Sequence, residues 1–457
     1  MPSTPNVPTP SGARVLPFEA VRRLLRHEAY ANLARLLHNF HHSESAEMLT
    51  HLPPGAQRRL LERLPDRELA ATIFTYLDES ARTALLPQLS TTFLVEMAKL
   101  LPPDDVVNIL RALPAPRLAE VRAYLPAALA DDLDTLLRYD PETAGGIMTT
   151  AYLALEETLT AEEALEKLRH AKEAETVFYV YIVDAAHRLV GVLSLRQLVL
   201  AAPDTRLKHL MDTDVISVSI DEDQEQTARL ITQYDFLALP VVDPSGTLVG
   251  IVTVDDIIDV IREETTEDIL RMAGVNPEEM LEGNVRGTIW HRLPWLFVSW
   301  LGGLLASYVI DAHHTTLQRV AMLAAFFPII IGMGGNTATQ SLAVAVRSLA
   351  TGSPMASALG RATLKEAGIG LSLGMIYGIL LGTVAFVWHG STAFGMVVGI
   401  AIWAAMTVAA LLGGLLPLVL SRLGIDPAVA SGPFLTTAID VIGLLLYLAT
   451  ARLLLLI

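Results

Sequence analysis

The chain has 457 residues, of which 52% are hydrophobic and only 18% are charged, and its formal net charge is −16 at pH 7. Such an acidic chain repels the phosphates of nucleic acids, which excludes nucleic acid as an expected partner. Only four of the 49 acidic and six of the 33 basic residues lie from Leu293 onward. This split predicts a soluble, acidic regulatory part followed by a membrane part, with metal cations as the expected ligands.

Two further absences narrow the function. There is no cysteine, which excludes disulfides and thiolate metal sites. No nucleophile and base pair, phosphate-binding loop or His-rich metal motif stands out, so we do not expect an enzyme. Residues 1–17 have no apolar signal-peptide core and are expected to form a disordered leader, so the later apolar segments must direct membrane insertion.

Residues 18–140 are rich in Leu, Ala and Arg, and proline interrupts them repeatedly, as in "HLPP", "LLPPDD" and "AYLP". Because proline ends one helix or begins the next, the pattern predicts short stacked helices in a cytosolic, all-α superhelical domain. His38, His41 and His42 are interpreted as solvated side chains rather than metal ligands. Asp104 and Asp105 are interpreted as ordinary acidic residues of a helix N-terminus.

Residues 141–253 contain an internal repeat. The stretch "VYIVDAAHRLVGVLSLRQL" is echoed 59 residues later by "LPVVDPSGTLVGIVTVDDI". Each copy combines β-branched strands with amphipathic helices, which predicts two α/β units that bury their sheets against each other. The repeat resembles a tandem pair of CBS domains.

The CBS resemblance implies a cleft for an adenine nucleotide such as ATP. In that cleft the hydroxyl of Thr253 and the carboxylate of Asp256 would lie near phosphate and ribose. The first copy has Ser194 and Gln197 at the equivalent places, so it has no acidic ribose contact. Alternatively, the repeat serves only as a dimerisation platform.

Residues 254–292 are expected to form an acidic connecting helix and a linker. The helix is predicted from Thr253 to Gly274, because no proline or internal glycine interrupts it and the glycine suits a helix C-cap. Acidic residues recur every three or four positions along one side of this helix. Like charges at this spacing repel each other by a few tenths of a kcal/mol per pair. Since the helix leads into the membrane part, we predict that its acids bind regulatory cations; a solvated acidic face is the alternative. One side of the helix carries Asp256, Asp259, Glu263 and Glu267, flanked by Asp255, Glu264 and Asp268.

Residues 293–457 contain five apolar segments, each long enough to cross about 30 Å of hydrocarbon at about 1.5 Å per residue. We place them at residues 293–310, 320–346, 367–388, 394–420 and 433–456. Most basic residues near these segments lie before the first, between the second and third, and between the fourth and fifth. The positive-inside rule then predicts a multi-pass protein of the cell (inner) membrane with a cytoplasmic N-terminus and an extracytoplasmic C-terminus.

The positions of glycine residues lead to a structural prediction for two of these segments. In the second, Pro328 with the glycines at 332, 334 and 335 predicts an interrupted helix just before Asn336. Such an interruption is tolerated at membrane depth only where it faces protein or water. In the third, glycines recur at every fourth position from Gly370 to Gly382, which predicts close packing on another helix.

The last apolar segment contains one acid, Asp440, seven residues after Pro433 and therefore about 10 Å along a helix. A carboxylate at that depth is costly unless it faces a cavity or a cation, and no lysine or arginine is near in sequence. Thr436 lies one turn earlier on the same face. In a two-fold dimer the paired carboxylates would supply the oxygen ligands that a hard divalent cation prefers. A protonated aspartate bonded between helices is the alternative.

Taken together, the chain resembles the MgtE family of magnesium channels along almost its full length. The most specific stretches are "GMGGNTATQS" at 332–341, "GIDPAVASGPFLTTAIDVIG" at 424–443 and "VDDIIDVIREETTEDIL" at 254–270. Family members often have "GGNTGNQ" where this chain has "GGNTATQ". The resemblance implies a homodimer in the lipid bilayer that passes Mg²⁺ inward through a central pore and closes when cytosolic Mg²⁺ is high.

The resemblance also assigns roles to residues. It implies that Asp440 is the selectivity carboxylate and that Asn336 lines the pore, to which we add Thr436. Two other functions remain open: a secondary transporter of another divalent cation such as Mn²⁺ or Co²⁺, or a nucleotide-sensing membrane signalling protein. Regulatory Mg²⁺ sites are implied at Asp223, Glu225, Asp235, Asp256, Asp259, Glu264, Glu267, Asp268 and Asp426.

Overall fold

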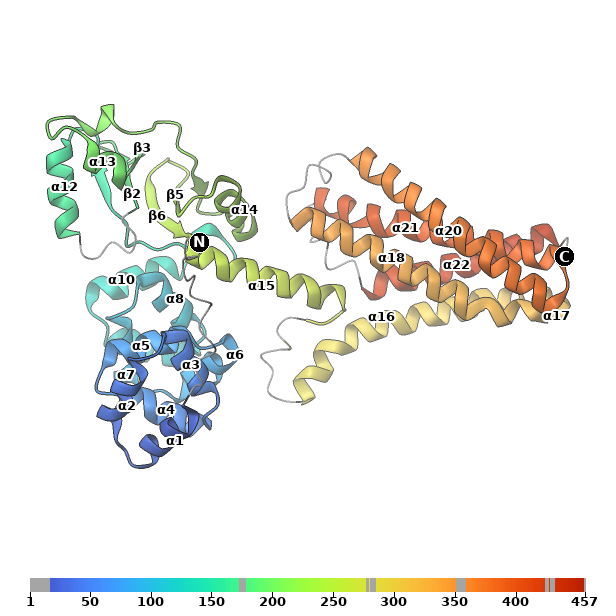
Figure 1. The fold of residues 1–457 in the computed structure, drawn as a ribbon, viewed down its shortest axis with the longest axis horizontal. Coiled ribbons are helices and arrows are strands. Elements are labelled where there is room, and N and C mark those ends of the chain that lie inside the picture. Colours follow the sequence, from blue (N-terminus) through green and yellow to red (C-terminus); the bar gives the residue numbers. More distant parts are fainter. Residues whose placement is uncertain are drawn as a thin grey trace, which may run out of the picture. The chain divides into compact units, whose positions relative to one another are not determined.

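The computed structural model describes residues 17–171, 178–276, 279, 285–350, 359–423, 427 and 432–455 (Figure 1). Residues 1–16, most of the predicted disordered leader, lie outside this range. The chain divides into two compact units, Met1–Asp259 and Val260–Ile457. The division falls within one helix, α15 (Val254–Met272), which therefore contributes residues to both units.

The first unit begins with short helices that confirm the predicted all-α arrangement. Prolines start several of them, because a proline in the first helical turn removes only an N–H that would be unpaired there. Alternate helices pack on one another, α3 on α5, α5 on α7 and α7 on α9. The helices are α1 (Phe18–Arg26), α2 (Tyr30–Leu37), α3 (His42–Thr50), α4 (Pro54–Arg63), α5 (Arg67–Thr75), α6 (Glu79–Leu85), η1 (Leu86–Gln88), α7 (Thr91–Ala98), α8 (Pro103–Arg111), α9 (Ala115–Ala123) and α10 (Ala127–Leu136).

The histidines of this domain have local roles. His38 Nε2 lies 2.9 Å from Asp66 Oδ2 at the start of α5. His41 caps α3, where its ring nitrogen accepts from the N–H of Ser43. These exposed, hydrogen-bonded positions agree with the solvated interpretation rather than with metal ligation.

The tandem repeat forms two three-stranded sheets with the same topology, order β1-β2-β3 and order β4-β5-β6. In each, the first pair of strands is parallel and the second pair antiparallel. A register shift falls at the equivalent places, Val183 and Val242. The elements are α11 (Ala144–Ile147), β1 (Ala154–Glu156), α12 (Ala161–His170), β2 (Tyr179–Val183), β3 (Leu189–Ser194), α13 (Leu195–Leu200), η2 (Leu207–His209), β4 (Val218–Ser219), α14 (Gln224–Tyr234), β5 (Ala238–Val242) and β6 (Leu248–Thr253).

Each copy sends its leading segment onto the other copy's sheet. Thr149, which precedes β1, forms a bridge with Ile251 of β6, while Asp212, which precedes β4, forms one with Val192 of β3. A core cluster draws on both sheets, including Tyr181 and Leu248. The prediction that the two sheets bury their faces against each other is therefore confirmed.

The connecting helix α15 ends as predicted. Gly274 has a φ of +73°, a left-handed conformation that other residues adopt with strain. Its N–H donates to Arg271 O at 2.9 Å, and the N–H of Val275 donates to Leu270 O at 2.9 Å. Gly274 is thus the C-terminal capping residue of the helix.

In the described part of the second unit, five helices are long and apolar enough to cross a membrane. They are the helices of the bundle drawn from yellow to red in Figure 1. The elements are α16 (Val285–Ala312), α17 (His314–Arg319), η4 (Ala321–Phe326), α18 (Phe327–Ala350), α20 (Leu359–His389), α21 (Thr392–Arg422) and α22 (Pro433–Leu454).

The predicted interruption of the second apolar segment is wrong. Helix α18 runs without a break through the glycines at 332, 334 and 335, and the irregular turn η4 precedes it. Pro328 lies in the first turn of α18, where proline is tolerated. Gly334 has a packing reason instead, because a Cβ there would lie 3.0 Å from Ile439 Cγ2 of α22.

The glycine series of α20 packs on α21, as predicted. A Cβ at Gly374, Gly378 or Gly382 would lie 2.8, 2.7 or 2.8 Å from a backbone carbonyl oxygen of α21. The absence of side chains therefore lets the two backbones approach closely.

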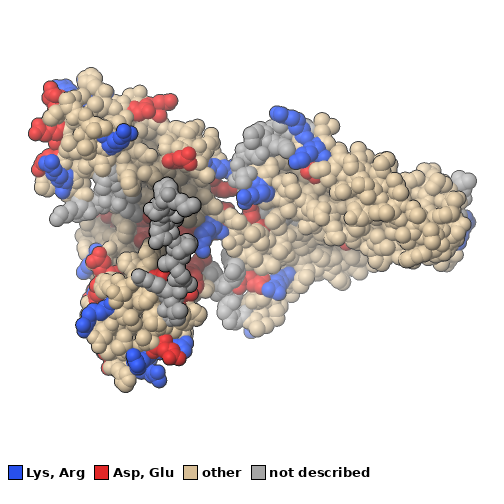
Figure 2. Space-filling view, viewed as in Figure 1, with Lys and Arg blue, Asp and Glu red and all other residues tan. Residues whose placement is uncertain are grey.

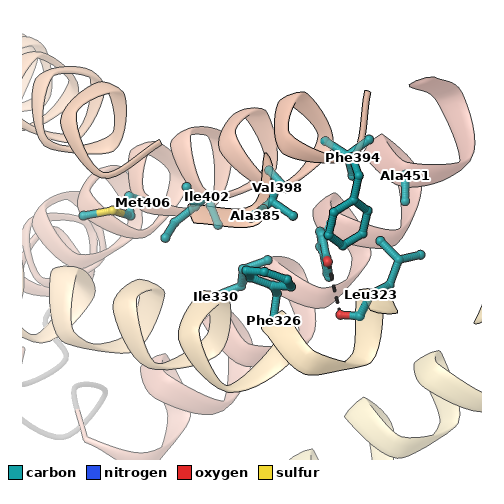
Figure 3. Close-up of a cluster of buried hydrophobic side chains, with 13 residues drawn as sticks. Leu323, Phe326, Ile330, Ala385, Phe394, Val398, Ile402, Met406 and Ala451 are labelled. Atoms are coloured by element: carbon teal, nitrogen blue, oxygen red, sulfur yellow. Dashed lines mark hydrogen bonds between the residues drawn. The ribbon is translucent and has the colours of Figure 1, made fainter. Parts of the chain in front are cut away.

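A buried hydrophobic cluster joins η4 and α18 to α20, α21 and α22 (Figure 3). The ring centroids of Phe326 and Phe394 lie 5.6 Å apart. The hydroxyl of Tyr447 on α22 donates to Leu323 O at 3.1 Å, which satisfies a buried polar group and joins α22 to η4.

We predict that Gly378→Ala lowers the melting temperature of the purified protein, because the added methyl group would lie 2.7 Å from Gly399 O. Overpacking of this kind costs about 1–3 kcal/mol. The matched control is Gly368→Ala on the same helix, where a Cβ meets no atom within 4 Å. Thermal unfolding of both variants in detergent tests this, and equal melting temperatures would contradict the packing account.

Candidate cation-binding sites

Helix α22, which carries Asp440, is held by close contacts on two sides. Gly302 of α16 lies against the side chain of Thr437, where any larger residue would collide. Gly334 of α18 lies against Ile439. Asp440 itself is half-buried, and no hydrogen bond or ion pair joins it to another residue of the described ranges. The structure thus fixes the helix around a carboxylate that has no cationic partner there.

The other predicted pore residues lie on the same pair of helices. The Thr436 hydroxyl donates to Gly432 O at 3.2 Å and Pro433 O at 3.3 Å, so its lone pairs stay available. Asn336 lies on α18, exposed in the single chain. The contact between Gly334 and Ile439 brings the two helices together two residues from Asn336 and one from Asp440.

The residues predicted to contact nucleotide bond to each other instead. Thr253 is fully buried, and its hydroxyl donates to the carboxylate of Asp256 in the first turn of α15. In the first copy, Ser194 and Gln197 form a capping box at the equivalent place, at the start of α13. The pair of the first copy therefore caps α13, and the pair of the second copy lies at the start of α15.

The acids predicted around α14 are spread out. Asp223 caps its N-terminus by accepting from the N–H of Glu225 at 2.8 Å, and Glu225 pairs with Arg229 at 2.7 Å. Asp235 follows the C-terminus with a φ of 54°. Asp223 and Asp235 flank a helix of 11 residues and lie about 18 Å apart along it, so one cation cannot bind both in a single chain.

The acids of α15 differ in their exposure to solvent. Asp255, Asp259 and Glu263 are exposed, whereas Asp256, Glu264, Glu267 and Asp268 are half-buried. Glu267 forms an ion pair with Arg271. Asp426 lies outside the described residues. Within the described ranges, no three Asp, Glu or His side chains lie close enough together to hold a metal ion.

An acidic cluster that the sequence analysis missed lies at the start of α8. It consists of Asp104, Asp105, Asp255 and Asp259, and we name it the α8–α15 acidic cluster. Asp104 is only 3% exposed, and its Oδ1 has no hydrogen-bond partner among the described residues. Burial raises the pKa of Asp104, although the Thr149 hydroxyl partly offsets this. Burial and the charge of Asp104 raise the pKa of Asp105 to about 7. The charges of Asp255 and Asp259 act in the same direction, and the charge of Arg82 offsets them in part.

The electrostatics of this cluster therefore favour the binding of a positive charge. Desolvation and like charges both disfavour the ionised form, and a cation or a proton relieves both. The sequence signal, "PPDD", equally describes an exposed helix N-terminus. Only the packing of α8 against the tandem repeat distinguishes this buried cluster from an exposed helix N-terminus.

The far end of α15 contacts the first turn of α22, within the second unit. A Cβ at Gly432 would lie 3.0 Å from Met272 O, and one at Gly274 would lie 3.1 Å from the ring of Pro433. Met272 also packs against the buried Leu435 and Ile439. The helix that carries the predicted regulatory acids thus ends on the helix that carries Asp440.

Family models match three successive parts of the chain. Residues 17–142 match the MgtE intracellular N domain, residues 144–204 and 207–263 match CBS domains, and residues 327–450 match the divalent cation transporter domain MgtE. The chain is 41% identical over 359 residues to the magnesium transporter MgtE of Thermus thermophilus, which covers 77% of this chain and 79% of that protein. With the magnesium transporter MgtE of Enterococcus faecalis it shares 43% identity over 319 residues, 70% of each chain.

A solved structure is also similar. The cytosolic domain of the Mg²⁺ channel MgtE in complex with ATP matches with a TM-score of 0.51 and 36% identity, over 53% of this chain and 99% of that one. The matches to the family models and to the two magnesium transporters together cover most of the chain. The chain belongs to the MgtE family of magnesium transporters, multi-pass membrane proteins that are not enzymes.

Proposed function

We propose that this chain forms a homodimeric, Mg²⁺-selective channel for magnesium uptake that closes when cytosolic Mg²⁺ is high. The observation that carries the proposal is the half-buried carboxylate of Asp440 in an apolar helix, without a partner in the described ranges. A carboxylate at membrane depth is a functional group by default. Its charge balance is supplied by the permeating cation.

In the proposed pore, two copies of α22 face each other across the dimer axis. Paired Asp440 carboxylates, with the oxygens of Thr436 and Asn336, would hold a cation that keeps several of its waters, as Mg²⁺ does. The basic residues Arg347, Lys365 and Arg422 lie toward one end of the helices, which supports a cytoplasmic N-terminus and an extracytoplasmic C-terminus.

The α8–α15 acidic cluster is proposed as a regulatory Mg²⁺ site. No three of its carboxylates lie close enough together to bind one ion, so at most two of them would bind Mg²⁺ directly and waters would supply the other ligands. Without Mg²⁺, its charges repel and favour separation of α8 from α15. A bound cation joins them and favours one position of α15, whose far end contacts α22. Binding in this way biases a two-state equilibrium by its differential affinity for the two states.

The other predicted regulatory acids require the second subunit. Since no three of them converge within the described part of one chain, we propose that subunit contacts complete their sites. Like the cluster, these sites would hold Mg²⁺ in the closed state. They comprise Asp223, Glu225, Asp235, Asp256, Glu263, Glu264, Glu267 and Asp268, together with Asp426.

ATP binding at the second CBS copy is proposed as a further input. The similar cytosolic domain was solved with ATP, which supports this. Thr253 and Asp256 already lie at a helix N-terminus, where phosphates bind well. Their mutual hydrogen bond would have to open for either group to contact nucleotide.

We expect Asp440→Asn to lower Mg²⁺ uptake into proteoliposomes by about tenfold or more, because the amide no longer offsets ion dehydration. Asp440→Glu keeps the charge and should retain part of the flux. Asp311→Asn, an exposed acid at the end of α16, is the control and should transport normally. Normal Mg²⁺ flux through Asp440→Asn would contradict the pore assignment, and flux coupled to protons or sodium would favour a secondary transporter.

A second prediction concerns Asp105, whose pKa is raised from 3.8 to about 7. A raised carboxyl pKa contributes stability that is fully present below pH 3.8 and is lost as the pH rises to about 7. In Mg²⁺-free buffer the wild type should therefore lose melting temperature over this interval, and Asp105→Asn should lose less. At pH 7.5, Mg²⁺ should raise the melting temperature of the wild type more than that of the variant.

Thermal unfolding of the full-length protein in detergent, with chelator or with Mg²⁺, measures both effects. Asp131→Asn removes an exposed acid of the same unit and serves as the control. Identical pH profiles for the wild type and Asp105→Asn would rule out the cluster as a strained, cation-dependent group.

A further inference from the structure

A cavity of about 450 Å³ lies among the end of α18, the beginning of α20 and the end of α21. That volume falls within the range of small-molecule sites, about 300–1,000 Å³. Its polar lining comes from Arg347, Ser348, Lys365 and Glu366, and its apolar lining includes Val344 and Leu418. None of these polar groups has a part in the proposed pore or in the regulatory sites.

Glu366 is the unusual member of this lining. It is only 8% exposed, and no hydrogen bond or ion pair joins it to another residue of the described part of the chain. The fold makes room for it, because a Cβ at Gly414 of α21 would lie 2.5 Å from Glu366 Cγ. The residue is mostly buried and lines the cavity, and its carboxylate oxygens are not among the fully buried atoms, so they are open to the cavity. An acceptor in so confined a place favours a ligand that donates N–H groups or carries positive charge.

The same cavity also carries positive charge, from Arg347 and Lys365. A simple cation would be repelled by these two residues, and a simple anion would be repelled by Glu366. The complementary ligand is a zwitterion with separate anionic and cationic groups. The cavity therefore selects by charge pattern rather than by net charge.

The depth of the cavity indicates where this zwitterion comes from. Helix α20 has 31 residues and is therefore about 46 Å long, which exceeds the hydrocarbon thickness of about 30 Å. The charged residues of α20 are Arg361, Lys365 and Glu366, all among its first eight residues, so the excess lies at this end. Glu366, seven residues or about 10 Å after Leu359, is then at the level of the lipid headgroups. Figure 2 shows Lys and Arg side chains gathered at an end of the helical bundle, whose flank is uncharged.

We propose that this cavity binds the headgroup of phosphatidylethanolamine. The lipid phosphate contacts Lys365 and Arg347, the ammonium group donates to the carboxylate of Glu366, and the acyl chains run along Val344 and Leu418. Such a lipid would join α18, the helix of Asn336, to α20 and α21. The inference requires only that the chain spans a membrane and does not depend on the proposed pore or gating.

Two other lipids, phosphatidylcholine and phosphatidylglycerol, test the ammonium contact separately from the phosphate contact. Phosphatidylcholine has the same charges, but its quaternary ammonium cannot donate a hydrogen bond. Phosphatidylglycerol has the phosphate without a cation. A charge-assisted hydrogen bond is strong enough for about tenfold selectivity, so phosphatidylethanolamine should be retained about tenfold over phosphatidylcholine.

The test is native mass spectrometry of the full-length protein released from nanodiscs that contain the three lipids in equal amounts. Glu366→Gln should bring the ratio of bound phosphatidylethanolamine to phosphatidylcholine close to one. Lys365→Gln should weaken the retention of both lipids. Asp311→Asn, near the other end of the bundle, should leave the ratio unchanged.

Equal retention of the two lipids by the wild type, preferential retention of phosphatidylglycerol, or an unchanged ratio in Glu366→Gln would overturn the proposal. A second arm needs no variant: wild-type protein is offered phosphatidylethanolamine with one, two or three N-methyl groups. Retention should fall when the third methyl group removes the last N–H donor, and retention that does not fall would also overturn it.

Discussion

A carboxylate that leaves water is stable only when a proton or a cation shares its charge, and the main functional features of this chain depend on that constraint. Asp104 and Asp105 are buried beside other acids at the start of α8, and Asp440 lies within an apolar helix. At the start of α8 the charge of Arg82 offsets the acids only in part, and the pKa of Asp105 is still raised to about 7. Around Asp440, close backbone packing holds the helix, and no lysine or arginine of the described ranges forms an ion pair with the carboxylate. We infer that the missing charge is Mg²⁺, bound in one place and permeating in the other.

Specific packing contacts place the acids within each of the two units. The leading segments exchanged between the two sheets fix Thr149 beside Asp104. Glycines let α16 and α18 approach α22 closely on either side of Asp440. Between them, α15 is one uninterrupted helix of 19 residues that ends at the capping Gly274, against the first turn of α22. In the proposed mechanism, Mg²⁺ at one end of that helix changes the position of the other.

Patterns with a strict period predicted the fold well. The constant offset of 59 residues fixed two equivalent sheets, and the four-residue glycine spacing predicted the packing of α20 on α21. The continuity of α18 was missed because the effect of a proline depends on its distance from the helix start, and η4 ends just before Pro328. The burial of Asp104 was missed for a different reason. It depends on contact with residues more than 40 positions away, which no local pattern reports. For Thr253 and Asp256, the sequence shows the pair but not that the two side chains bond to each other.

The most direct measurement of the central claim is the number of protons released when Mg²⁺ binds to the full-length protein near pH 7. Calorimetric titration in two buffers with different ionisation enthalpies gives this number. Because the pKa of Asp105 is about 7, part of the cluster carries a proton at this pH, and a cation that binds there must displace it. The account predicts proton release by the wild type that falls in Asp105→Asn. Mg²⁺ binding without proton release, or with the same release in both proteins, would contradict it.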